Sequence, residues 1–369
     1  MARSGLGANW SCLMANDIDA KKTSIYAANW GKEGLIPGDI ATLSSQNIPA
    51  SAEMAWASFP CQDLSLAGSG AGLKGERSGT FWNFWNIMQG LQAEQRSPKI
   101  VVLENVCGAL WSHGGEDFSA IGTALADGGY RLGAVIVDAV HFVPQSRPRL
   151  FVIAVKDGFF VPEHLRMQEP DLMWHPAHLV RAYERLPKSV QNAWFWWRLP
   201  VPPRRVTNFS DLIEDEPFGV VWHTQEETQR LLSLMSPLHV RKVEQAKRLG
   251  FRVVGGIYKR TRVDENGNRT QRAEVRFDGI SGCLRTPTGG SSRQTILIVE
   301  GEDVRSRLLS PREAARLMGL TDDYILPENY NEAYHLAGDG VVVPVVRFLA
   351  EYLLEPILMS DKRRKRQAA

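Results

Sequence analysis

Short apolar runs alternate with longer amphipathic stretches from about Leu13 to about Val155. Runs of this kind, bounded by turn residues, are typical of strands buried inside a sheet. The predicted strands end near Asn16, Ser58 and Leu103, and a later pair covers residues 131–139 and 150–155. The predicted helices between them cover residues 81–91 and 119–125. This alternation predicts an α/β fold with a mostly parallel sheet and helices on both faces.

The regular pattern ends near Phe160. Prolines recur from Pro162 to Pro203, and aromatic side chains cluster at residues 194–197, which predicts a second, smaller and irregular domain. Ser310 then starts a helix, with Pro at the first helical position and Glu three residues after the cap. The apolar stretch 341–358 predicts a long helix that packs back on the sheet. We therefore expect domains at 1–160 and 161–328, followed by a returning C-terminal helix and basic tail at 329–369.

The composition places the chain among ordinary globular proteins, with 44% hydrophobic and 23% charged residues. No apolar run approaches the roughly 18 residues that span a bilayer, and no signal-peptide pattern opens the chain. The four cysteines are far apart in sequence and form no Cys-x-x-Cys pair. We therefore predict neither a disulfide framework nor a metal site, and a location in a reducing cytoplasm away from membranes.

Positive charge is concentrated in one stretch, although the net charge is only +2. Residues 241–276 hold eleven Lys or Arg against four acids. Such a surplus provides the phosphate neutralisation on which nucleic-acid binders depend, and a solvated charged face is the alternative interpretation. The terminal run 362–366 is also basic, and we interpret it as a tail with weak phosphate attraction.

Three reactive groups stand beside predicted strand ends. Cys61, in Phe59-Pro60-Cys61-Gln62, follows one strand, and Glu104, in Glu104-Asn105-Val106, follows another. Arg147 and Arg149, in Gln145-Ser146-Arg147-Pro148-Arg149, precede a third. Open α/β sheets place their chemistry at strand ends, so these groups can converge on one small planar substrate. Each also has a structural alternative: an inert buried thiol, a turn-capping carboxyl, or a surface ion pair.

These blocks resemble the DNA (cytosine-5) methyltransferase family. Pro-Cys-Gln, Glu-Asn-Val and Gln-x-Arg-x-Arg occur in the family's order and at roughly its spacing. The resemblance continues through residues 309–319 and 333–338 and covers most of the chain except a variable middle. It implies a Rossmann-like S-adenosylmethionine-dependent methyltransferase domain with a second, target-recognition domain.

The resemblance also implies roles for the strand-end residues. Cys61 matches the nucleophile, whose thiolate adds to C6 of cytosine so that C5 can attack a methyl donor. Glu104 matches the residue that binds N3 and the 4-amino group, and must itself carry a proton to donate to N3. Arg147 and Arg149 match arginines near the base O2 and the catalytic loop, where guanidinium donors favour developing charge.

The implied donor is S-adenosylmethionine. Asp17 matches the acid that binds the ribose hydroxyls, and Asp39 the acid beside the adenine amino group. Ile18 and Phe81 match positions that wall the adenine. Near the C-terminus, Asp339 stands in Gly338-Asp339-Gly340, where the family commonly has Gly-Asn-Ser, so it brings an extra carboxylate to the implied pocket.

The family's opening strand and its Gly-rich turn are absent, and Met1 falls just after the point where they would end. We expect in-frame sequence directly upstream to encode them. We also expect the 369-residue chain to bind S-adenosylmethionine poorly, because the backbone amides of that turn are not available to the donor.

Double-stranded DNA is the implied partner. The Gly-rich stretch 68–80 matches the loop that closes on DNA behind an extruded cytosine, and it lacks the Gly-Lys-Ser/Thr ending of a phosphate-binding P-loop. The candidate DNA contacts are Gln62, Ser65, Lys259, Arg260, Arg262 and Arg293. We expect a monomer, and a restriction endonuclease acting on the same site is a compatible companion. Two alternatives stay open: a catalytically impaired DNA-binding homologue, and an RNA cytosine methyltransferase on the same fold.

Overall fold

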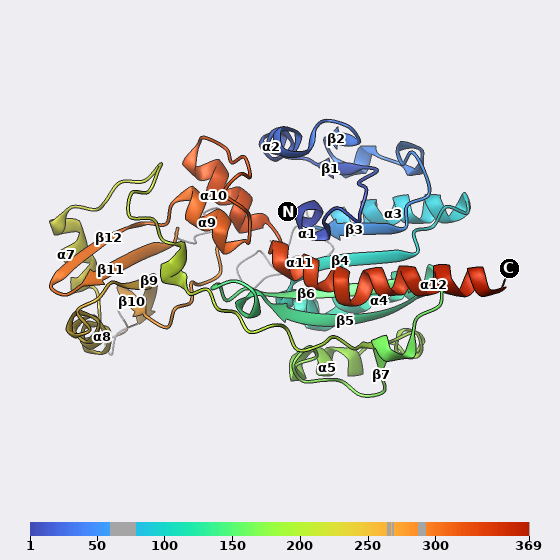
Figure 1. Ribbon diagram of the computed structural model, residues 1–369. Coiled ribbons are helices and arrows are strands. Elements are labelled where there is room, and N and C mark those ends of the chain that lie inside the picture. Colours follow the sequence, from blue (N-terminus) through green and yellow to red (C-terminus); the bar gives the residue numbers. More distant parts are fainter. Residues whose placement is uncertain (60–78, 264–266, 268, 287–292, 369) are drawn as a thin grey trace. The chain divides into compact units, whose positions relative to one another are not determined.

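The computed structural model describes residues 1–59, 79–263, 267, 269–286 and 293–368; at position 262 and from 362 onward, only the backbone is described. The chain divides into two compact units (Figure 1). Unit 1 comprises Met1–Ser4, Ala139–Arg147 and Pro203–Pro344. Unit 2 comprises Gly5–Asp138, Pro148–Pro202 and Val345–Ala369. The chain therefore crosses between the units several times.

Unit 2 contains a four-stranded sheet in the order β3-β4-β6-β5. Its strands are β3 Met54–Ser58, β4 Ile100–Val106, β5 Tyr130–Asp138 and β6 Pro148–Lys156. β3 and β4 are parallel, whereas β6 runs antiparallel to both β4 and β5. A separate parallel pair, β1 Ala15–Asp17 and β2 Leu35–Pro37, precedes them in the chain. The predicted mostly parallel sheet is thus a mixed arrangement with parallel portions.

Two amphipathic helices bury their apolar faces against this sheet. They are α3 Thr80–Ala93 and α4 Glu116–Asp127, and each contributes side chains to one core with β3, β4 and β6. The C-terminal segment is a continuous helical run formed by α11 Val343–Leu349, a π-helical turn Ala350–Leu354, and α12 Glu355–Ala368. Val346, Leu349 and Leu353 in this run are completely buried. The remaining N-terminal helices are α1 Ala2–Leu6 and α2 Ala20–Trp30.

The segment that follows β6 covers the outer edge of β5. Leu132 of β5 accepts a backbone hydrogen bond from Phe195 and donates one to Ala193, and Ile136 donates to Trp174. The approach is close at Gly133, where an added Cβ would lie 2.2 Å from the Phe195 carbonyl oxygen. The segment's own elements are β7 Arg166–Met167, α5 Ala177–Glu184, α6 Lys188–Asn192 and β8 Trp196–Trp197. This cover protects a sheet edge that would otherwise be open to pairing with other chains.

Unit 1 is built around an antiparallel sheet in the order β10-β9-β11-β12. Its strands are β9 Val253–Val263, β10 Arg269–Arg276, β11 Thr295–Glu300 and β12 Asp303–Leu308. Its helices are α7 Gln225–Ser233, α8 Pro237–Arg248, α9 Pro311–Leu317 and α10 Tyr330–Asp339. Ser310 caps α9 as predicted, and Glu313 completes a capping box. Glu313 also accepts a hydrogen bond of 2.6 Å from Arg307, with both side chains fully buried.

The predicted strands at 54–58, 131–139 and 150–155 and the predicted helices at 81–91 and 119–125 are confirmed within a few residues. The strand predicted to end near Leu103 is also confirmed within a few residues, since β4 continues to Val106. Its antiparallel pairing with β6 holds Glu104 and Asn105 inside the ladder. The two compact units also have bounds that differ from the predicted division at 160 and 328, so the predicted roles of the domains stay predictions. None of the described helices is long and apolar enough to cross a membrane.

Candidate active site

Glu104 and Arg149 lie side by side on neighbouring strands. Arg149 is the register partner of Val106, and its Nε atom lies 3.4 Å from Oε1 of Glu104. The two side chains are only 15% and 9% exposed, respectively. The ion pair is therefore largely shielded from water. Its electrostatic attraction is stronger there than it would be at the exposed surface. The structure thus brings together two of the four residues predicted to be catalytic.

The strand that leads to Cys61 runs next to Glu104. β3 ends at Ser58, whose register partner on β4 is Glu104, and Phe59 is buried directly after it. Cys61, Gln62 and Ser65 themselves lie outside the described residues. The parallel pairing of β3 and β4 therefore places Ser58 beside Glu104, the predicted cytosine-binding residue. Cys61 follows Ser58 by three residues in the sequence.

Cys107 lies near Arg149 of this pair, and no motif in the sequence indicates a role for it. Burial raises the pKa of its thiol to about 11, while the nearby Arg149 guanidinium lowers it and Asp138 raises it. At neutral pH Cys107 is therefore a protonated thiol and a poor nucleophile.

Arg147 lies in unit 1, where its guanidinium binds backbone carbonyls. It donates hydrogen bonds to Leu284 O at 2.8 Å, Gly338 O at 2.7 Å and Gly340 O at 2.8 Å, and its side chain is almost completely buried. Two of these contacts hold the carbonyl groups of the glycines on either side of Asp339. Arg147 thus holds the Gly-Asp-Gly segment in place, and its predicted catalytic role stays a prediction.

Gln145, in the same segment, also binds backbone groups of unit 1. In the sequence it is singled out only as the first residue of the Gln-x-Arg-x-Arg block. Its fully buried side chain donates to Leu317 O at 2.8 Å and accepts from Leu284 N at 3.1 Å. Gln145 and Arg147 therefore connect the segment before Arg149 to three distant parts of unit 1, at Leu284, Leu317 and residues 338–340.

Asp17 is the last residue of β1, and Asp39 follows the end of β2, the adjacent parallel strand, by two residues. Asn16 joins these ends, because its side chain donates to Ile36 O at 2.8 Å and to Gly38 O at 2.9 Å. Ile18, between the acids in sequence, is 71% exposed. Two carboxylates and an uncovered apolar side chain at one sheet edge fit a ligand with hydroxyl groups and a flat apolar ring, such as an adenosine.

The other two predicted donor-binding residues are placed differently. Phe81 is completely buried and packs against the rings of Phe59 and Trp85, at centroid distances of 5.6 and 6.3 Å. Asp339 belongs to unit 1, whereas the other residues predicted to bind the donor belong to unit 2. Contacts of Phe81 and Asp339 with a donor therefore stay predictions.

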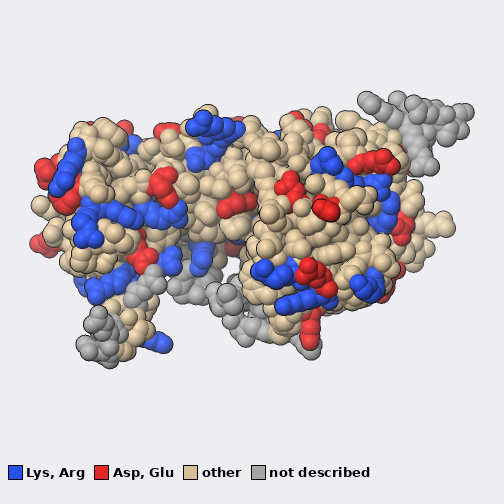
Figure 2. Space-filling view, turned by 90° about the horizontal axis from the view of Figure 1, so that it is seen from below, with Lys and Arg blue, Asp and Glu red and all other residues tan. Residues whose placement is uncertain are grey.

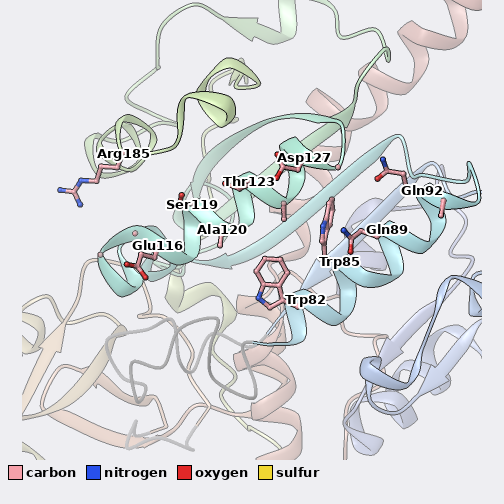
Figure 3. A pocket seen from close by; sticks show the side chains of 15 residues that line it. Trp82, Trp85, Gln89, Gln92, Glu116, Ser119, Ala120, Thr123, Asp127 and Arg185 are labelled. Atoms are coloured by element: carbon pink, nitrogen blue, oxygen red, sulfur yellow. The ribbon is translucent and has the colours of Figure 1, made fainter.

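A groove of about 1000 Å³ lies between α3 and α4 of unit 2. Figure 3 shows Trp82 and Trp85 of α3 on one side and Ser119, Ala120 and Thr123 of α4 on the other. Among the residues that the structure describes, none of those predicted to be catalytic or donor-binding lines this groove.

The predicted DNA contacts all belong to unit 1 where they are described. Lys259 and Arg260 are exposed neighbours on β9, and Arg260 forms an ion pair with Glu274 at 3.2 Å. Arg262 lies on the same strand, and its side chain is outside the described part. Arg293 donates a hydrogen bond to Asn331 and lies over the ring of Tyr330. Figure 2 shows Lys and Arg side chains gathered on the surface at its left, over the part that holds the β9–β12 sheet.

The sequence profile of the C-5 cytosine-specific DNA methylases matches residues 3–355. The chain belongs to this family. The resemblance and the Rossmann-like α/β fold predicted from the sequence are confirmed.

Curated relatives of this methylase cover nearly all of it. It is 24% identical over 357 residues to the type II methyltransferase M.DsaV of Dactylococcopsis salina, spanning 96% of this chain and 82% of that protein. It is also 24% identical over 340 residues to the type II methyltransferase M.HhaI of Haemophilus parahaemolyticus, spanning 92% of this chain and 86% of that one.

Solved structures show the same fold. The Dnmt2 methyltransferase of S. pombe superposes with a TM-score of 0.57 at 19% identity, over 96% of this chain and 94% of that one. A putative DNA modification methyltransferase encoded within an E. coli prophage gives a TM-score of 0.55 at 16% identity, over 97% and 95% of the two chains.

Proposed function

We propose that this methylase transfers a methyl group to C5 of a cytosine extruded from a specific duplex DNA sequence. The observation that carries the proposal is the Glu104–Arg149 pair, beside the strand that leads to Cys61. The carboxyl and the guanidinium lie next to one another, and Cys61 follows Ser58, the register partner of Glu104, by three residues in sequence. These residues supply the three groups that cytosine activation requires. Extrusion is needed because a stacked base is out of reach of the thiol, at a cost of roughly a few kcal/mol.

In the proposed reaction Cys61 bonds to C6 of the base, and the electron pair of the C5–C6 double bond becomes available at C5. Glu104 hydrogen-bonds N3 and the 4-amino group, and Arg149 stabilises charge on the ring near O2 while it holds Glu104 in place. When S-adenosylmethionine is bound, it supplies the sulfonium methyl group that C5 takes up. Loss of the C5 proton to a base then re-forms the double bond and releases the Cys61 thiolate.

Asp17, Asp39 and Ile18 are the residues that would hold the donor. Their carboxylates would accept hydrogen bonds from the ribose hydroxyls and the adenine amino group, and Ile18 would cover the adenine ring. Duplex DNA is the proposed partner. A monomeric state, a companion endonuclease and a cytoplasmic location stay predictions.

The test compares Cys61→Ser with Cys107→Ser, a matched control at a thiol that is protonated at neutral pH. Duplexes with 5-fluorocytosine should form a covalent adduct with the unmodified chain and with Cys107→Ser, and none with Cys61→Ser. Bisulfite sequencing of DNA from cells that express the chain should identify the modified sequence. Full methylation by Cys61→Ser would contradict the proposal, and methylation of RNA in place of DNA would select the alternative substrate.

A further inference from the structure

Strand alternation divides the basic residues of the β9–β10 hairpin between two faces. Register partners in an antiparallel pair share a face, and successive residues along a strand alternate. Lys259 pairs with Ala273, and Arg260 pairs with Arg272. Ala273 is completely buried in a core with Ile257 and residues of α7 and α8. Lys259 therefore belongs to the helix-covered face, and Arg260 and Arg272 belong to the opposite one.

This opposite face, which we call the arginine face, includes Tyr258, Arg260, Arg272 and Glu274. Thr270 and Arg276 have the same alternation, and Arg276 forms an ion pair with Asp278. Arg260 lies over the Tyr258 ring at 5.9 Å, and its Nε is 3.2 Å from Glu274. Arg272 is exposed, and within the described residues no acid lies within ion-pair distance of it. Like charges directly opposite each other destabilise a strand pair. An anion placed between Arg260 and Arg272 would remove that repulsion.

The arginine face continues into segments that carry family motifs. The ring of Tyr258 packs so closely on Gly282 that a Cβ there would lie 2.4 Å from its hydroxyl oxygen. Two residues further on, Leu284 binds the side chains of Gln145 and Arg147. The helix-covered face is instead occupied by α7 and α8. A duplex lying on the arginine face would therefore also lie beside the segment that leads to Arg149.

We propose that Arg260 and Arg272 bind the phosphate backbone of duplex DNA, and that Glu274 limits this affinity by holding Arg260 in the free protein. The inference rests on the proposed function and names the face of the hairpin that meets the substrate. Arginine suits the role because its planar guanidinium binds phosphate oxygens in a bidentate fashion. The carboxylate of Glu274 competes for Arg260 and repels phosphate, so it weakens contacts that do not depend on sequence.

The test measures duplex dissociation constants over a salt series for four single variants. Arg272→Gln and Arg260→Gln should each lower the slope of log K against log salt by about one, and should weaken binding equally to target and scrambled duplexes. Arg230→Gln, a matched control at an exposed arginine of α7, one of the helices that cover the other face, should leave the slope unchanged. Glu274→Gln should bind both duplexes several-fold more tightly and discriminate between them less.

Because all four side chains lie on the surface or close to it, thermal unfolding should be nearly the same for each variant and for the unmodified chain. An unchanged slope for Arg272→Gln would overturn the inference, as would an equal loss for Arg230→Gln. Weaker binding by Glu274→Gln would overturn the role of Glu274. The unmodified chain is first tested for methyl transfer to DNA, so a failure of the proposed function is seen separately, before any variant is compared.

Discussion

Arg149 reaches back along the sheet to Glu104, with 3.4 Å between Nε and Oε1. Its register partner is Val106, two residues further along β4, so the contact is a diagonal one across an antiparallel pair. Diagonal neighbours on one face are within reach of long side chains. The carboxyl and the guanidinium thus lie on the same side of the sheet, and each fixes the orientation of the other.

Replacing Glu104 with Gln should lower the rate of methyl transfer by about 10²–10⁴-fold, because an amide cannot supply a proton to N3 of the base. DNA binding should change little, since the substitution keeps the size of the side chain. Arg149→Lys retains the charge and loses the planar fork, so it should give a smaller loss. Single-turnover methyl transfer measures both variants, and near-normal transfer by Glu104→Gln would contradict the assignment.

Cys107 should react slowly with alkylating reagents in the folded protein. Burial raises its pKa to about 11, so at pH 7.5 its thiolate fraction is about two orders of magnitude below that of an ordinary cysteine. Quantitative mass spectrometry of iodoacetamide-labelled peptides measures the rate. Unfolding the chain should restore normal reactivity. Equal rates for Cys107 in the folded and unfolded chains would refute the prediction.

His175 should make the protein acid-sensitive between pH 6.5 and 4. Burial lowers its pKa to about 4, and its Nδ1 accepts a hydrogen bond from Asp171 N at 3.0 Å, which fixes the neutral form. The unfolded chain binds a proton here at higher pH than the folded one, so stability is full above pH 6.5 and falls as the pH decreases towards 4. The loss amounts to about 3 kcal/mol.

Chemical denaturation across this pH range tests the prediction for His175. His175→Asn keeps an acceptor for the Asp171 amide and should flatten the dependence on pH by up to one proton. The exposed His164, replaced in the same way, is the control and should leave the dependence unchanged. An equal slope in His175→Asn and the unmodified chain would contradict the prediction.

Gly133→Ala should destabilise unit 2 strongly. Its Cβ would lie 2.2 Å from the Phe195 carbonyl oxygen and 2.7 Å from Trp197 Nε1, and neither group can move without breaking the cover on β5. We expect a loss of about 3 kcal/mol or more, at the upper end of overpacking effects. Gly256→Ala on β9 meets nothing closer than 3.4 Å and is the matched control. Thermal unfolding of the two variants gives the comparison, and equal midpoints would refute the prediction.

The sequence by itself determined the family, the chemical groups and most of the local elements. Pro-Cys-Gln, Glu-Asn-Val and Gln-x-Arg-x-Arg are short contiguous blocks, so their order is visible without any fold. The helices around Phe81 and Ser119 and the strand at 54–58 follow from apolar periodicity, which depends only on near neighbours. The α9 cap at Ser310 and Glu313 is equally local.

Only the tertiary structure decided which of these groups meet. The antiparallel pairing of β6 with β4 brings Arg149 next to Glu104. Arg147, only two residues earlier, instead donates hydrogen bonds to backbone carbonyls of unit 1. The register of β9 with β10 places Lys259 and Arg260 on opposite faces of the sheet, and Arg272 on the same face as Arg260. A count of charges along the sequence cannot show this distribution. The physical reason is common to both: strand pairing and burial connect residues far apart in sequence, so a pattern of neighbours cannot specify them.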